Sequence, residues 1–141
     1  MILVDTNVVI DARNSKSPFH RWAEELLARG LSTEGVALNA IVLAELSVGH
    51  NDPKSIETEL RAKGISILDV PAQASLICGN AYNKYRSSRR KSGGGGGSRV
   101  PLPDFFIGAH AELMGWKLAT RDSERFRLYF PDVELIEPAA A

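Results

Sequence analysis

Residues 1–11, MILVDTNVVID, decide the fold class. Residues 1–4 form a continuous apolar run that stops at Asp5. A run without polar residues fits a strand that is buried on both faces, as in a parallel sheet. An acid that follows such a strand lies at the carboxyl edge of the sheet, where open parallel sheets bind their ligands. The stretch therefore predicts a buried first strand and a functional role for Asp5.

The rest of the chain alternates between strand-like and helix-like segments. Proline near the start and glycine after the end delimit several of the helices, as Pro18 and Gly30 do for residues 18–29. Further strands are predicted at 35–39, 65–69, 116–120 and 133–136, and further helices from about Ala40 and over 53–63, 71–87, 104–115 and 124–130. This alternation predicts a three-layer α/β/α sandwich with a mostly parallel, five-stranded sheet.

The 141 residues are enough for one domain, which we expect to span 1–137. The run KSGGGGGS has no side chains that could pack, so we predict a flexible loop over about 91–99. Residues 138–141 are predicted to be a tail.

Composition and charge narrow the class of protein. The 17 basic and 17 acidic residues cancel, which argues against a bulk polyanion binder. The basic stretch from Arg86 to Arg99 either contacts phosphates or is a solvated helix end. No apolar run approaches the roughly 20 residues that span a bilayer. We therefore expect no membrane contact. The single Cys78 cannot form an internal disulfide, which fits a reducing cytoplasm, so we expect a cytoplasmic protein.

Four acidic residues are the candidate catalytic residues and metal ligands: Asp5, Glu45, Asp104 and Asp122. Asp122 follows the fourth predicted strand, Asp104 opens a helix, and Glu45 lies in the helix after the second strand. Carboxylates gathered at one place repel one another unless a cation neutralises them. Oxygen ligands favour Mg²⁺ or Mn²⁺, and the three histidines are scattered.

A carboxylate-bound Mg²⁺ suits one kind of chemistry in particular. It activates a bound water and neutralises charge on a phosphodiester, so cleavage of nucleic acid is its obvious use. A Ser or Cys nucleophile with a His partner is not needed, and none is evident in the sequence.

Each acid also has a purely structural interpretation. Asp5 is suited to a turn or a helix cap, and Asp104 to an N-cap after Pro103. Asp122 could pair with Arg121 or Arg125, or cap the short helix that follows.

Other polar residues near the acids are supporting candidates. Thr6, Asn7 and Thr120 either orient the carboxylates as a second shell or provide turn and cap chemistry. Asp11 could be a spare ligand, but we expect it to cap a helix or to be exposed.

Four segments together resemble the PIN domain family. MILVDTN resembles its first motif, with Asp5 as the acid, and AIVLAEL (40–46) its second, with Glu45. LPDFFIGAHA resembles the third motif and supplies Asp104, and LATRD resembles the fourth and supplies Asp122. The motifs occur in order over nearly the whole chain, although the five-glycine run departs from the family pattern.

A PIN domain of this size resembles the VapC toxins of toxin–antitoxin pairs. The resemblance implies an endoribonuclease that cleaves RNA with Mg²⁺ or Mn²⁺. It also implies a homodimer and a small VapB-type antitoxin that covers the acidic site.

Three alternatives remain. A receiver-like signalling domain binds Mg²⁺ at strand ends, but it needs an acceptor Asp after its third strand, where only Asp69 stands, and a late Lys that WKLATRD does not provide. A phosphatase with an Asp nucleophile needs a second Asp at the position of Asn7. The third alternative is a PIN-like module that binds its ligand without catalysis. The presence of all four acids argues against this alternative.

Overall fold

Five parallel strands form one sheet in the order β3-β2-β1-β4-β5. In the computed structural model, which describes residues 1–91 and 102–139, β1 is the central strand. Within it, Leu3 pairs in register with Ala37 of β2 and Leu118 of β4. The strands are β1 (Ile2–Val4), β2 (Val36–Asn39), β3 (Ser66–Leu68), β4 (Lys117–Ala119) and β5 (Leu135–Ile136).

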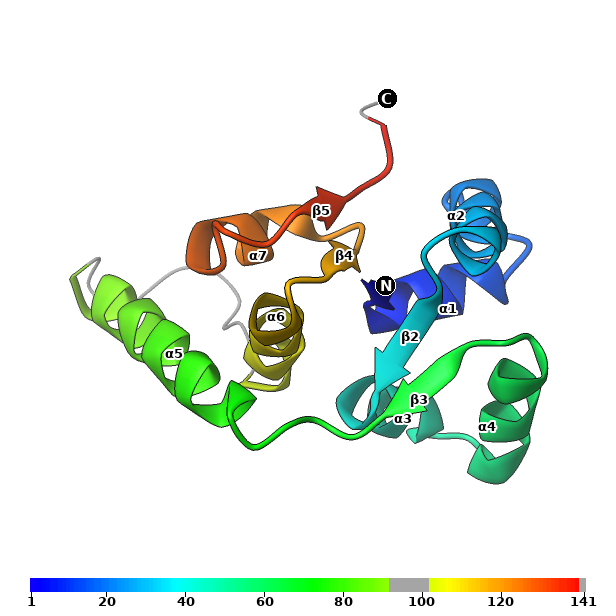
Figure 1. Ribbon diagram of the computed structural model, residues 1–141, viewed down its shortest axis with the longest axis horizontal. Helices are drawn as coiled ribbons and strands as arrows, with labels where there is room; N and C mark the ends of the chain where they lie inside the picture. The colour runs from blue at the N-terminus through cyan, green and yellow to red at the C-terminus, as the bar shows by residue number, and fades with distance from the viewer. Residues whose placement is uncertain (92–101, 140–141) are drawn as a thin grey trace.

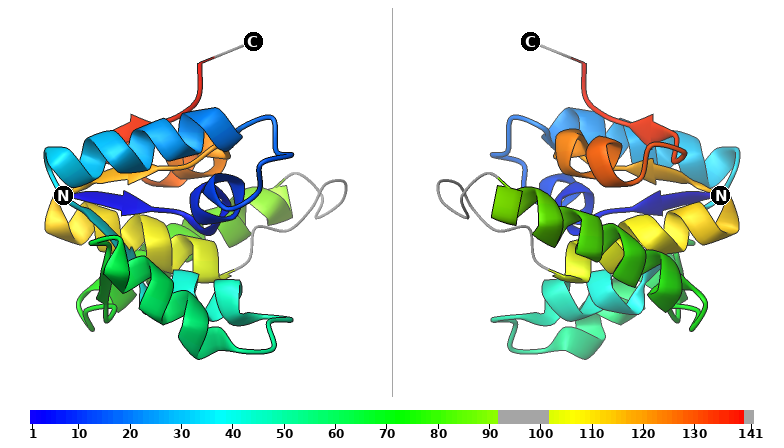
Figure 2. Two further views of the ribbon diagram at one scale, coloured as in Figure 1. Left: turned by 90° about the vertical axis from the view of Figure 1, so that its right-hand side faces the viewer. Right: turned by 90° about the vertical axis from the view of Figure 1, so that its left-hand side faces the viewer.

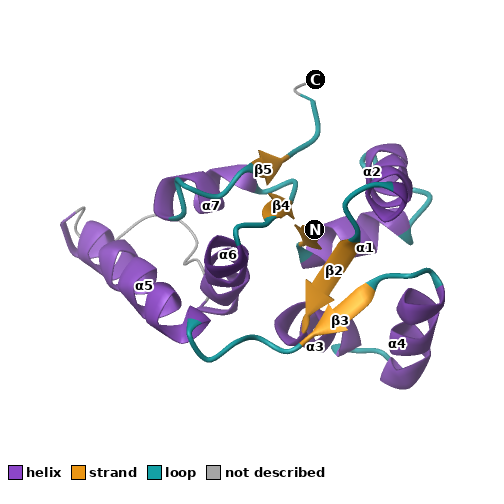
Figure 3. Cartoon of the chain, in the orientation of Figure 1, coloured by secondary structure: helices purple, strands orange, loops and turns teal. Residues whose placement is uncertain are grey.

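Helices cover both faces of this sheet. In Figure 1, α1, α2 and α4 lie on the right of the sheet, and α5, α6 and α7 lie on its left. The helices are α1 (Thr6–Ala12), α2 (His20–Ser32), α3 (Ala40–Ser47), α4 (Pro53–Ala62), α5 (Ala74–Lys91), α6 (Leu102–Met114) and α7 (Ser123–Tyr129). Figure 3 shows the same layers by element type. The predicted α/β/α sandwich with a parallel five-stranded sheet is confirmed.

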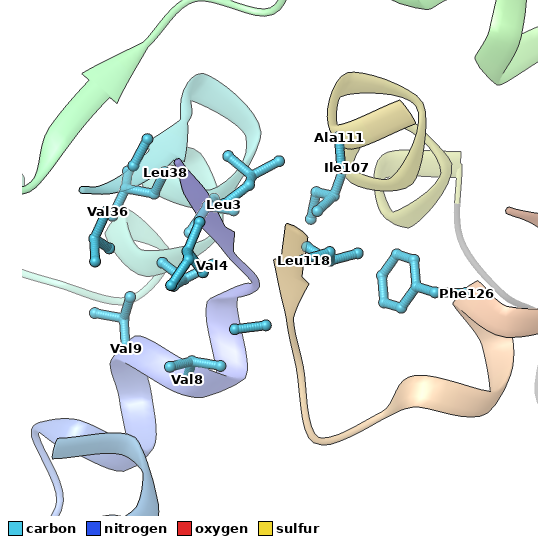
Figure 4. Packing of buried hydrophobic residues seen from close by; sticks show 14 of the residues in the cluster. Leu3, Val4, Val8, Val9, Val36, Leu38, Ile107, Ala111, Leu118 and Phe126 are labelled. Atoms are coloured by element: carbon cyan, nitrogen blue, oxygen red, sulfur yellow. The ribbon is translucent and has the colours of Figure 1, made fainter. Parts of the chain in front are cut away.

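The core lies between the central strands and the helix layers. Leu3 and Val4 are fully buried, as the continuous apolar run at residues 1–4 predicted, and Leu118 of β4 is fully buried beside them. Figure 4 shows Val8 and Val9 of α1 on one side of these strands and residues of α6 on the other. Burying apolar side chains on both faces gives the sheet a fixed position between its helices.

Three helices differ from the sequence prediction. Helix α1 follows β1 directly, although Thr6 and Asn7 had also been interpreted as turn chemistry. Helix α2 runs from His20 to Ser32, so Gly30 lies inside it and does not end it as predicted. Helix α5 begins at Ala74 and continues to Lys91, so the basic residues 86–91 are helical. The rest of the predicted glycine loop, 92–99, lies outside the described residues, as do residues 140 and 141 of the predicted tail.

The carboxyl ends of the strands point to one edge of the molecule. Figure 2 shows β1 pointing toward α1, with the end of α5 and the start of α6 at the same edge. None of the helices in the described ranges has the length and apolarity that a bilayer crossing requires. The sheet therefore brings the candidate acids, which follow strands or open helices, to a common edge.

Candidate active site

Asp5 lies at the centre of the site, between the end of β1 and the start of α1. It is the N-cap of α1 and only 5% exposed, and its Oδ1 accepts a hydrogen bond from the Thr6 backbone N–H at 2.7 Å. The pKa of Asp5 is raised to about 6, chiefly by burial; the hydrogen bonds from Thr120 and Thr6 lower it, and the nearby carboxylates of Asp104 and Glu45 add to the rise. Among residues 1–91 and 102–139, no basic side chain forms an ion pair with this carboxylate.

Asn7 and Thr120 join Asp5 to Asp122. The Thr120 hydroxyl donates to Asp5 Oδ2 at 2.8 Å and accepts from the Asp122 backbone N–H at 3.0 Å. The Asn7 side-chain amide donates to Oδ2 of both aspartates, at 3.2 Å in each case. Since one amide bridges both acids, the β4–α7 loop is held against the start of α1.

Glu45 reaches the site from the second turn of α3. Its Oε1 accepts a hydrogen bond from the Thr6 hydroxyl at 2.7 Å. Asn39 holds the start of α3 by accepting from the Val42 backbone N–H at 3.1 Å, so the helix begins at the end of β2. Glu45 is thereby fixed toward Asp5 although the two are 40 residues apart.

Asp104 lies in the first turn of α6 and is 7% exposed. The Arg125 guanidinium donates to its Oδ2 and lies 3.6 Å from Asp122 Oδ2. Burial raises the pKa of Asp104, Arg125 opposes that shift, and Asp122 adds to it. Arg125 therefore acts as a cation between two of the four acids.

A family model for the PIN domain matches residues 2–130. The chain belongs to the PIN domain family. A comparison with curated proteins finds no match.

Solved structures share the fold of this PIN domain along nearly their whole length. FitAcB from Neisseria gonorrhoeae is 25% identical with a TM-score of 0.63, and the match covers 97% of each chain. VapBC2 from Rickettsia felis, bound to promoter DNA, is 24% identical with a TM-score of 0.64, over 99% of this chain and 100% of the other. VapC20 of Mycobacterium tuberculosis, described as a toxin that cleaves the sarcin–ricin loop, is 18% identical with a TM-score of 0.65, over 95% and 99%.

The donor set of this PIN domain fits a hard divalent cation. Four carboxylates face one edge, and Asp5 has a raised pKa because burial and neighbouring acids disfavour its charge. Across residues 1–91 and 102–139, no three His, Cys, Asp or Glu side chains already form a ligand group for one ion. Mg²⁺ is commonly held by one or two carboxylates together with waters, so a closed cage is not required.

The structure brings together all four acids that the sequence singled out. It also places Thr6, Asn7 and Thr120 in hydrogen bonds to these acids. Asp122 makes no side-chain capping bond to α7, contrary to the capping interpretation, and Asp104 lies within α6 rather than at its cap. Their service as metal ligands stays a prediction.

The expectation for Asp11 is wrong. Asp11 lies inside α1, is 2% exposed, and pairs with Arg121 Nε at 2.7 Å. Sequence reasoning also missed the contact between Arg125 and Asp104. Both arginines belong to the segment around the fourth motif, but nothing in their local sequence indicates partners so distant in the chain.

Proposed function

We propose that this PIN domain is a metal-dependent endoribonuclease and the toxin of a VapBC-type pair. The observation that carries the proposal is the convergence of four carboxylates at one sheet edge, with Asp5 buried and, among the described residues, in no ion pair with a basic side chain. Such an arrangement is costly for a protein unless it binds a cation.

The side chains have distinct roles in the proposed reaction. Asp5 and Asp104 hold Mg²⁺ or Mn²⁺, and Glu45 and Asp122 complete the acidic environment. When bound, the ion supplies an activated water and neutralises charge on the phosphodiester. Thr120, Asn7 and Thr6 keep the carboxylates in place through the hydrogen bonds described above.

Similarity to solved structures supports the toxin role. VapBC2 is described as bound to a DNA fragment from its promoter, and VapC20 as a toxin that cleaves the sarcin–ricin loop. By analogy, we expect a VapB-type antitoxin that covers the acidic edge, a homodimer, and action in the cytoplasm. Coelution with the antitoxin and light scattering at micromolar concentration test these assemblies; a monomer would contradict the dimer.

The strand order argues against a receiver-like domain. Receiver-like sheets have the order 2-1-3-4-5, which places the third strand next to the first. Here β3 is at the edge of the sheet, beyond β2, so Asp69 after it is remote from β1 and exposed. A PIN-like module that binds without cleaving is the remaining alternative, and a cleavage assay separates the two.

Cleavage of RNA by the purified protein tests the proposal. We expect RNA to be cut with Mg²⁺ or Mn²⁺ and to stay intact with EDTA. Asp5→Asn and Asp104→Asn should each reduce cleavage by at least about 100-fold, because each removes a proposed ligand. Asp69→Asn, an exposed acid after β3, is the matched control and should cut at the parent rate. If both site variants cut like the parent, the assigned site is wrong.

A further inference from the structure

Arg121 is held in a built position at the edge of the acidic site. Its Nε donates to Oδ2 of Asp11 at 2.7 Å, and its guanidinium carbon lies 5.1 Å from the centre of the Phe19 ring. The Asp11 side chain is only 4% exposed, and its other oxygen accepts from the Ser17 hydroxyl at 2.9 Å. One edge of the guanidinium and one of its faces are therefore fixed by the protein.

The opposite edge of the guanidinium carries donors that are not used within the part of the chain that the structure describes. Neither of its Nη atoms donates a hydrogen bond to another described residue, and the side chain is 34% exposed. Arg125 differs, because its guanidinium already pairs with Asp104. Of the two described arginines that line the open depression beside Asp122, Arg121 is therefore the one whose Nη donors make no hydrogen bond to another described residue.

This edge of the guanidinium lies beside the acids. Arg121 and Asp122 line the same open depression. The Arg121 backbone N–H donates a hydrogen bond to Oδ1 of Asn7, with 3.4 Å between the two atoms. That same Asn7 bridges Asp5 and Asp122, so the backbone of Arg121 is fixed to the site.

Stability alone does not account for the pair of buried Asp11 and partly exposed Arg121. Burial of the Asp11 carboxylate carries a desolvation cost that an apolar residue at this position would not have. What the pair supplies is a rigid, oriented guanidinium. A guanidinium fork matches the oxygens of a phosphate and loses little freedom when it binds if it is already fixed.

We infer that Arg121 is a preorganised phosphate-binding residue that contacts the RNA backbone at a phosphate next to the one that is cleaved. The inference rests on the proposed function, since it takes RNA as the ligand of the acidic edge. It assigns Asp11 and Phe19 the task of holding the guanidinium, and neither of them touches RNA.

Removing Arg121 alone leaves a buried, unpaired Asp11, which can cost about 3–5 kcal/mol and unfold the protein. The comparison is therefore made within the Asp11→Asn background, where no buried charge is orphaned. Asp11→Asn retains Arg121, whereas Asp11→Asn with Arg121→Ala lacks it. Asp11→Asn with Arg61→Ala is the matched control, because it removes an exposed arginine of α4 that pairs only with Glu57 among the described residues.

The readout is the affinity for a fluorescein-labelled single-stranded RNA, measured by anisotropy in EDTA over a series of KCl concentrations. We expect loss of Arg121 to weaken binding about tenfold and to reduce the slope of log affinity against log salt by about 0.7, the value for one phosphate contact on a single strand. The Arg61 control should keep both the affinity and the slope. Asp11→Asn alone should bind less tightly than the parent with an unchanged slope.

Two other outcomes overturn the inference. If Arg121 only ties the β4–α7 loop to α1, loss of its side chain will leave the salt slope of the Asp11→Asn protein unchanged. If the parent binds no RNA, the inference also fails. The proposed function is judged separately by cleavage with Mg²⁺: cleavage by the parent together with an unchanged slope rejects the inference and leaves the function standing.

Discussion

Burial and neighbouring charge at Asp5 give the metal-free protein a distinctive pH dependence. The pKa of Asp5 is about 6 in the folded protein against 3.8 in a model peptide. Between these values the folded state keeps a proton that the unfolded chain releases, so this carboxyl makes the folded state less stable as pH rises from about 4 to 6. Above about pH 6, Asp5 is ionised in both states, and its contribution to the free energy of unfolding no longer changes with pH.

Asp5→Asn tests this dependence because an amide does not ionise. In EDTA, we expect the variant to match the parent near pH 4 and to exceed it by on the order of 2 kcal/mol in free energy of unfolding at pH 7. Urea denaturation at intervals of pH measures the difference. Asp69→Asn, which changes an exposed carboxyl, should show no such trend. A constant difference between the Asp5 variant and the parent at every pH contradicts the explanation.

Arg125 pairs with Asp104 and lies near Asp122, so we expect it to compete with the proposed divalent cation for these two acids. Arg125→Met removes the guanidinium that pairs with Asp104, so the pKa of Asp104 should rise. A divalent ion would then no longer have to displace this guanidinium from the carboxylate. We expect Mg²⁺ to bind about fivefold more tightly, which corresponds to about 1 kcal/mol. Isothermal titration calorimetry measures this affinity. Arg127→Met, in the same helix but paired with Glu137, should bind Mg²⁺ as the parent does; equal affinities of the two variants count against the competition.

At the scale of elements, strands and their order of appearance were predictable, and α1 was not. A continuous apolar run such as residues 2–4 indicates a strand that is buried on both faces, and it can be recognised from neighbouring residues alone. Helix α1 contains β-branched residues after an Asp-Thr-Asn sequence that favours turns, and it forms because Val8 and Val9 are buried against the sheet. Asp5 and Asp122 were predictable from their place after strands, and Glu45 and Asp104 from their place in helices that resemble PIN motifs. The pair of Asp11 and Arg121 joins residues 110 positions apart, beyond any local pattern.

The packing of α6 against the segment after α7 depends on Gly108. A Cβ at this position would overlap the ring of Phe130, which is 2% exposed and packs between Phe105 and Phe126. Gly108→Ala should therefore destabilise the protein by about 1–3 kcal/mol through overpacking. The shift of α6 should also move Asp104 and lower RNA cleavage.

Gly79 of α5 provides the matched control for Gly108. It is also helical, but nothing lies within 4 Å of its added Cβ. Gly79→Ala should stabilise the protein by about 0.5–1 kcal/mol, because alanine is a better helix former. Thermal unfolding of the two variants measures both effects, and stabilisation by both substitutions would show that Phe130 yields without cost.

At the scale of the whole molecule, the site joins both helix layers through the sheet. Asp5 lies between β1 and α1, Glu45 comes from α3, and Asp104 comes from α6, which lies across the sheet from α1 (Figure 1). Arg125 of α7 spans from Asp104 to Asp122. A ligand that draws these carboxylates together therefore stabilises the packing of the layers as well as the site.

Global stability should consequently rise with the concentration of Mg²⁺ or Mn²⁺. A ligand that binds only the folded state adds RT ln(1 + [L]/Kd), which is about 2.7 kcal/mol at 100 times Kd. The melting temperature should increase with each tenfold rise in metal and return to its starting value with EDTA. Asp104→Asn should lose most of the increase, whereas Asp132→Asn, an exposed acid before β5, should keep it. Equal melting temperatures of the parent in saturating metal and in EDTA would mean that the four carboxylates do not hold the ion that the proposed ribonuclease requires.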